Sequence, residues 1–173
     1  MKRMSSHRAI AFADASSEAI ATPAVGVVSM DDSHRAQVAL VDAIERAAAQ
    51  GNDEHVGGLL LRLFEETSDH FASEHELMRA TAFPEREAHI EEHVRLLQQV
   101  SDLLACHSAG QMTRRSIESL RGWLLSHIQG MDRRLGDYLV AYTRDQTAGS
   151  FERDLAVDVR TPAIERLSDY VAG

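Results

Sequence analysis

Cysteine, lysine, proline and aromatic residues are all scarce in this sequence of 173 residues. Cys106 is the one cysteine, so no disulfide can form within the chain, which fits a reducing compartment. Three prolines and an aromatic content of 5% argue against a strand-rich protein, because strands favour aromatic and β-branched residues. The chain also lacks an uninterrupted apolar run, so we expect no secretory signal and no membrane span. These absences predict a cytoplasmic protein.

Basic charge is carried almost wholly by arginine, since Lys2 is the only lysine, and it is outweighed by acidic residues. The formal net charge is −9, and such a surface repels both nucleic-acid phosphate and anionic lipid. We therefore expect neither nucleic acid nor membrane as a partner. The length suits one domain with a real core, and the abundance of Ala, Leu, Arg and Glu favours helices.

Apolar residues recur at helical spacing in four consecutive segments. We expect helices at about 31–50, 53–82, 84–107 and 113–143, with Pro84 in the first turn of the third and Thr113 as N-cap of the fourth. The expected fold is all-α, an up-and-down antiparallel four-helix bundle with an N-terminal arm and a C-terminal tail helix. The corresponding divisions are 1–28 for the arm, 29–145 for the bundle and 146–173 for the tail.

Histidines occur at spacings that place them on common helix faces. His89 and His93 are four residues apart in the third segment, so they lie about 40° apart on one side of a helix. His70 and Glu74 repeat this spacing in the second segment. Both pairs adjoin the apolar stripe, which predicts that they face the interior of the bundle.

The other two segments each add a histidine near their apolar stripes, His34 in the first and His127 in the fourth. Buried ionisable groups are costly unless they are paired or bound to metal, so five inward histidines with a carboxylate predict a metal site. Asp132 is harder to place, because five residues from His127 correspond to about 140° on an ideal helix. Either a local widening of the helix or a carboxylate that reaches around it is required.

These residues and their contexts resemble the hemerythrin family, specifically the bacterial hemerythrins. The resemblance covers about residues 28–143. The matching contexts are Met30-Asp31-Asp32-Ser33-His34, His70-x3-Glu74, Phe83-Pro84 followed by His89-x3-His93, and Trp123-Leu124-Leu125-Ser126-His127-Ile128 followed by Asp132. The sequence departs from the family at Ser33, where glutamine is usual.

The resemblance implies a non-heme diiron centre with an oxo or hydroxo bridge. Its ligands would be His89, His93 and His127 on one iron, His34 and His70 on the other, and Glu74 and Asp132 bridging both. The second iron then has one vacancy, where dioxygen would bind reversibly in a pocket made apolar by Trp123, Leu124 and Ile128. The expected function is oxygen storage, delivery (oxygen transport) or sensing, without enzymatic activity.

Three alternatives stay open. A diiron oxidase or peroxidase-type enzyme is disfavoured, because none of the histidines follows a glutamate by three residues, as ferritin-like sites require. A sensory module could use the same oxygen site and signal to a protein partner through the tail. A metal-free structural bundle is the third. The four remaining histidines, His7, His55, His75 and His107, are expected to be structural.

Overall fold

The structure, a computed structural model, describes residues 22–153, and none of them lies in a β-strand. The helices are α1 (Val28–Ala49), α2 (Asp53–Ala80), α3 (Arg86–Ser108), α4 (Arg114–His127), the π-helix η1 (Ile128–Asp132) and α5 (Arg133–Arg153). The predicted all-α class is confirmed.

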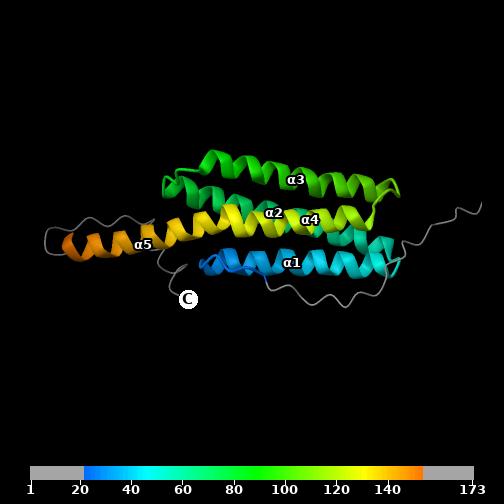
Figure 1. Cartoon of the computed structure of the whole chain (residues 1–173), viewed down its shortest axis with the longest axis horizontal. Coiled ribbons are helices and arrows are strands. Elements are labelled where there is room, and N and C mark those ends of the chain that lie inside the picture. The colour runs from blue at the N-terminus through cyan, green and yellow to red at the C-terminus, as the bar shows by residue number, and fades with distance from the viewer. Residues whose placement is uncertain (1–21, 154–173) are drawn as a thin grey trace, which may run out of the picture.

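The helices form an antiparallel bundle with short connections (Figure 1). Helix α1 packs against α2 and α4, and α3 packs against the same two helices, so the four surround a common interior. Helices α4, η1 and α5 follow one another without a break and form a single rod, whose far end projects beyond the other helices. The predicted up-and-down four-helix bundle is confirmed.

Local sequence signals explain where the helices begin and end. Gly51 has a φ of 68°, a left-handed conformation that stops α1, and the Asn52 side chain then accepts a hydrogen bond from the backbone N–H of His55. Thr113 caps α4 as predicted, because its side chain accepts from the backbone N–H of Ser116 at 3.2 Å. The turns are therefore encoded by residues next to each helix.

Some boundaries differ from the prediction. Helix α3 begins at Arg86, so Pro84 lies in the preceding turn and not within the helix. The fourth helix continues past Thr143 to Arg153, and no proline interrupts it there. The short helix expected after Thr161 lies outside the described residues, and the division into arm, bundle and tail stays a prediction.

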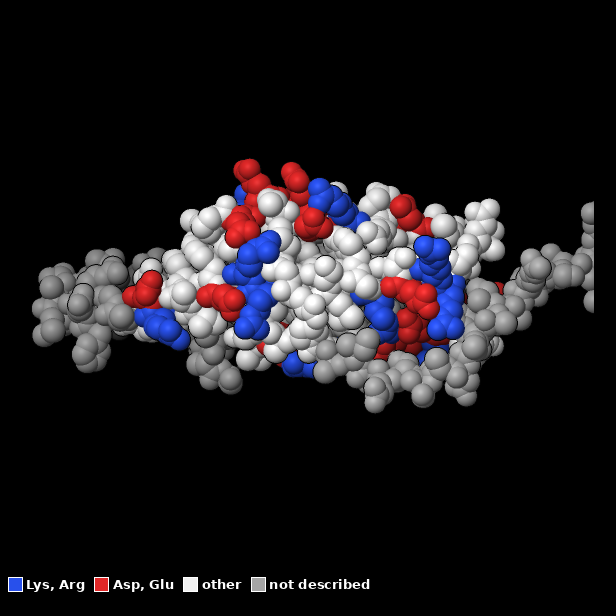
Figure 2. Space-filling view, in the orientation of Figure 1, with Lys and Arg blue, Asp and Glu red and all other residues white. Residues whose placement is uncertain are grey.

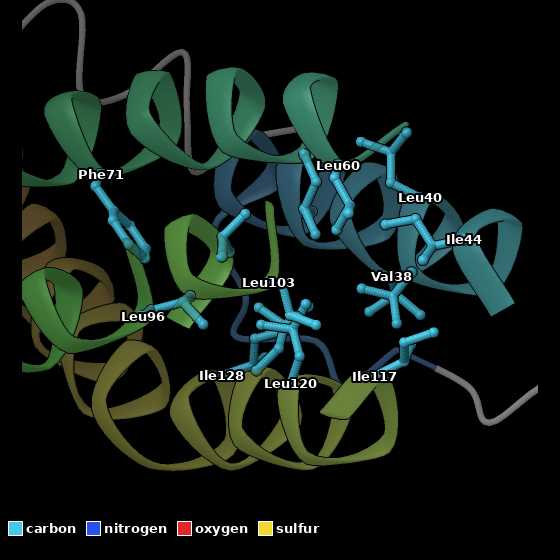
Figure 3. Packing of buried hydrophobic residues seen from close by; sticks show 14 of the residues in the cluster. Val38, Leu40, Ile44, Leu60, Phe71, Leu96, Leu103, Ile117, Leu120 and Ile128 are labelled. Atoms are coloured by element: carbon cyan, nitrogen blue, oxygen red, sulfur yellow. The ribbon is translucent and has the colours of Figure 1, made fainter. Parts of the chain in front are cut away.

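A continuous apolar core fills the interior and is built from all four sides of the bundle (Figure 3). Ile44 of α1, Leu60 of α2, Leu103 of α3 and Leu120 of α4 are all buried. Each such side chain contributes about 1.5–3 kcal/mol to stability when it leaves water. This core holds the helices in register and so places the polar side chains that lie further along them.

The segment just before α1 packs on α5. The Asp31 carboxylate accepts a hydrogen bond of 2.7 Å from the backbone N–H of Val25, whose side chain is buried. A Cβ atom at Gly136 would overlap the carbonyl oxygen of Val25. Glycine at this position therefore allows the two backbones to come together, and residues 22–27 of the predicted arm lie on the bundle.

Charged side chains of both signs are interspersed on the face shown in Figure 2. One ion-pair cluster joins two helices, since the Arg121 guanidinium of α4 bonds to Glu45 at 2.9 Å and also to Asp42, both on α1. No helix in the described part of the chain is long and apolar enough to cross a membrane.

Gly136→Ala is expected to destabilise the protein by about 1–3 kcal/mol, because the added methyl group must push Val25 away. Gly58→Ala is the matched control, since no atom lies within 4 Å of a Cβ at this exposed helical position. It should stabilise by about 0.5–1 kcal/mol through helix propensity. Urea unfolding followed by circular dichroism measures both, and equal responses would contradict the close approach at Gly136.

Candidate metal centre

Five histidines and two carboxylates meet in the interior, and each has an exposed fraction of 5% or less. They come from all four sides of the bundle and form two groups, each with donor atoms within 4.8 Å of one another. One group contains Glu74, His89, His93, His127 and Asp132, and the other contains His34, His70, Glu74 and Asp132. The structure thus brings together all seven residues singled out in the sequence.

The π-helix η1 explains how Asp132 reaches the centre. A π-helix repeats its hydrogen bonds at five-residue intervals, so residues five apart lie about one turn from each other. Asp132 is five residues after His127, and its Oδ1 lies 3.0 Å from Nε2 of His127. Of the two possibilities left open by the sequence, the local widening of the helix is the one that occurs.

Glu74 directs one carboxylate oxygen toward each group. Its Oε1 lies 3.2 Å from Nε2 of His70. Its Oε2 lies 3.1 Å from Nε2 of His93 and 3.4 Å from Nε2 of His89. This carboxylate therefore stands between the two groups.

Asp132 has the same arrangement. Its Oδ2 lies 3.1 Å from Nε2 of His34, while its Oδ1 lies 2.9 Å from Nε2 of His89 and close to His127. Two carboxylates that each face both groups are what a pair of neighbouring cations with bridging ligands requires.

Among these seven side chains, the only hydrogen bond joins His89 and Asp132, so hydrogen bonding does not account for the cluster. Nε2 atoms of His34, His70, His93 and His127 have no hydrogen-bond partner, although a carboxylate oxygen lies within 3.2 Å of each. Oδ2 of Asp132 and both oxygens of Glu74 are also without one. Donor atoms that approach closely without bonding to each other suit a shared cation, and imidazole with carboxylate is a donor set that iron accepts.

Comparisons with known proteins agree with this geometry. The family model described as "Hemerythrin HHE cation binding domain" matches residues 25–139, which is more than half of the chain. The chain belongs to the hemerythrin family. It is 26% identical over 119 residues to a bacteriohemerythrin of Stenotrophomonas maltophilia, covering 68% of this chain and 78% of that protein.

Two solved structures are also similar, a leucine-to-phenylalanine variant and a hemerythrin with one leucine replaced by tyrosine. Each is 28% identical with a TM-score of 0.61, covering 65% of this chain and 88% of the other. The hemerythrin family and the buried cluster together indicate a metal site.

Without a cation, this hemerythrin site is electrostatically strained. Burial, with the negative charge of Asp132 adding to it, raises the pKa of the Glu74 carboxyl to about 8. Burial lowers the pKa of His70 to about 3, with His34 adding to the effect, and also shifts the pKa of His93 far downward. Both imidazoles are therefore neutral at pH 7, which is the form that binds metal.

His89 and Asp132 shift in the opposite sense. Burial alone would lower the pKa of His89, but contacts with Asp132 and Glu74 raise it to about 9. Burial alone would raise the pKa of Asp132, but His127, His34 and His89 hold it well below its usual value. A cation in the centre would take over the role of the protons that Glu74 and His89 otherwise hold.

Aromatic rings fix the planes of two histidines. The buried Phe71 ring stacks on His93 with centroids 3.6 Å apart, and Trp123 stacks on His127 at 5.4 Å. Trp123 is only partly buried and lines a surface pocket of about 240 Å³ with the edge of His127. Leu124 and Ile128, the other two residues predicted for the oxygen pocket, are fully buried in the core.

His75, which was expected to be structural, belongs to neither group of ligand residues but contacts one of their histidines. Its Nε2 lies 2.9 Å from Nδ1 of His93, and the two rings stack at 5.0 Å. Nε2 of His93 faces the centre, so with a metal bound to Nε2 the hydrogen would lie on Nδ1 and be donated to Nε2 of His75. Antiparallel packing of α2 and α3 creates this contact, so spacing along the chain could not reveal it.

His75→Leu is expected to weaken metal binding about ten- to a hundredfold, because partners of a ligand's second ring nitrogen orient it and raise its basicity. His75→Gln, whose amide oxygen can accept the same hydrogen bond, should recover part of the loss. Co²⁺ affinity measured by competition with a chelating dye reports both. The control is His55→Leu at an exposed position in α2, and a His75→Leu protein indistinguishable from this control would contradict the role of His75.

Proposed function

We propose that this chain is a cytoplasmic protein that binds dioxygen reversibly at a non-heme diiron centre, for storage or delivery. The ligands would be His34, His70, Glu74, His89, His93, His127 and Asp132. The observation that supports this proposal most strongly is that Glu74 and Asp132 each direct one oxygen to a group of three histidines and the other to a group of two.

The unequal groups define where a gas molecule would bind. A metal at the group of three histidines would have three imidazoles, two carboxylate oxygens and a solvent-derived bridge, six ligands in all. A metal at the group of two histidines would have one imidazole fewer and therefore one ligand fewer. When bound, the iron pair would supply the electrons and the open position that dioxygen needs.

The surrounding side chains favour binding over catalysis. Leu124 and Ile128 are buried beside His127 and exclude water from this part of the interior. The donor set contains five histidines and only two carboxylates, unlike the glutamate-rich ferritin-like sites that support oxidation chemistry. We therefore propose an oxygen-binding protein and not an oxidase or peroxidase.

Protein reconstituted anaerobically with Fe²⁺ is expected to hold two iron ions per chain. Exposure to air should produce a visible charge-transfer band that disappears on degassing, as measured by absorption spectroscopy and iron analysis. His70→Ala should abolish the band, because it removes one of only two imidazoles in the second group. His55→Ala is the matched control and should leave it unchanged.

Absence of iron after anaerobic reconstitution would contradict the metal centre itself. Two bound irons with a spectrum that air changes irreversibly would contradict reversible binding and favour an oxidase.

Oxygen sensing is a second candidate, supported by the continuous rod of α4, η1 and α5. Asp132 ends the π-helix and is followed directly by α5, whose far end projects from the bundle (Figure 1). A shift of this carboxylate would be transmitted along the helix without an intervening loop.

A sensor is expected to change the rate at which trypsin cleaves after the exposed Arg144 when the reduced protein is oxygenated. Cleavage is followed by mass spectrometry, and cleavage after the exposed Arg62 of α2 serves as the internal control. Equal rates in the reduced and oxygenated forms would leave storage or delivery as the function.

A further inference from the structure

Gln37 on α1 is a buried amide without a partner. Its exposed fraction is 1%, and neither Oε1 nor Nε2 forms a hydrogen bond. Among the described residues, the other buried side-chain atoms without a partner belong to the seven residues of the centre and to Arg86. An amide left unbonded in a dry interior destabilises the fold, so its presence calls for a ligand or a water molecule that it bonds.

Helix geometry directs Gln37 toward the centre. It follows His34 by three residues, which places the two about 60° apart on the same face and less than one turn apart along the axis. Long side chains on a helix lean toward its N-terminus and cover the preceding turn. The amide of Gln37 therefore leans toward His34, which belongs to the group with one ligand fewer.

Three other buried residues occupy the same level of the bundle. The chain runs in opposite directions in neighbouring helices. A residue at this level therefore follows the ligand histidine on α1 and α3 and precedes it on α2 and α4. Three residues after His93 is Leu96, and three residues before His70 is Thr67. Three residues before His127 is Leu124, and all of these side chains have exposed fractions of 3% or less.

At this level of the bundle, polar and apolar side chains lie on different helices. On α1 and α2, which carry His34 and His70, it contains the polar residues Gln37 and Thr67. On α3 and α4 it contains only leucines. Polar side chains thus lie beside the incomplete group and apolar ones beside the complete group, which is the arrangement expected if an external ligand needs hydrogen bonds only on one side.

We propose that the Gln37 amide donates a hydrogen bond to a small ligand bound at the His34 and His70 group, with Thr67 completing a polar half of the pocket. This inference rests on the proposed function. The ligand class is a molecule of two or three atoms that accepts hydrogen bonds, such as dioxygen or a small anion. A carboxamide donates a hydrogen bond but does not release its proton near neutral pH, so it holds the ligand without protonating it.

The test uses azide, a small anion that binds ferric iron and accepts hydrogen bonds. In iron-loaded, oxidised protein, Gln37→Leu is expected to weaken azide binding about three- to tenfold, the equivalent of one net hydrogen bond. The metal-free variant should also melt at a higher temperature, because leucine removes the unpaired amide. Visible titration measures the affinity, and calorimetry measures the melting temperature.

Controls separate this hydrogen bond from general effects on packing. Leu96→Met changes the apolar half of the same level without removing a donor and should leave azide affinity within about twofold. Thr67→Val removes the neighbouring hydroxyl and should weaken azide less than Gln37→Leu does. In the unmodified protein, the infrared stretch of bound azide should shift in D₂O, a measurement that needs no variant.

Outcomes against the proposal are distinct from failure of the proposed function. A chain without iron contradicts the diiron centre and, with it, this inference. If Gln37→Leu has full iron content and unchanged azide affinity, the role of Gln37 is overturned while the diiron centre stands. A lower melting temperature together with unchanged affinity would show that the amide is purely structural. If Gln37→Leu does not fold, absence of the D₂O shift overturns the role of Gln37.

Discussion

Two carboxylates in a dry interior are the constraint on which the rest of the structure depends. Glu74 and Asp132 are buried side by side, and their repulsion and desolvation raise the pKa of Glu74 to about 8. Five buried imidazoles surround them, and most of the facing atoms form no hydrogen bond. Such a cluster is costly unless cations occupy it, so the fold and the metal are expected to stabilise each other.

The bundle meets this constraint with apolar packing on both sides of the centre. Ile44 and Leu120 are buried on one side and Met78 and Leu135 on the other, and together they hold the four helices in register. Between these layers, the register brings the five histidines and the two carboxylates together. The π-helix is the one local departure from regular geometry at the centre, and it turns Asp132 inward beside His127.

The surroundings of the centre are not uniform. His93 is held by a stacked Phe71 and by the hydrogen bond to His75, whereas Nδ1 of His89 and of His127 has no protein partner. On α1, which carries His34, Gln37 is a buried amide without a hydrogen-bond partner. These differences are features by which this chain would tune its metal centre.

The sequence by itself determined the helices, the cap at Thr113, and the pairing of His89 with His93, because helical periodicity is a local property. It also carried the resemblance to hemerythrins. Only the tertiary structure decided the place of Asp132, since a π-turn is retained when distant side chains stabilise it. The contact of His75 with His93 and the isolation of Gln37 likewise depend on neighbouring helices, and no spacing within one helix specifies what a neighbour presents.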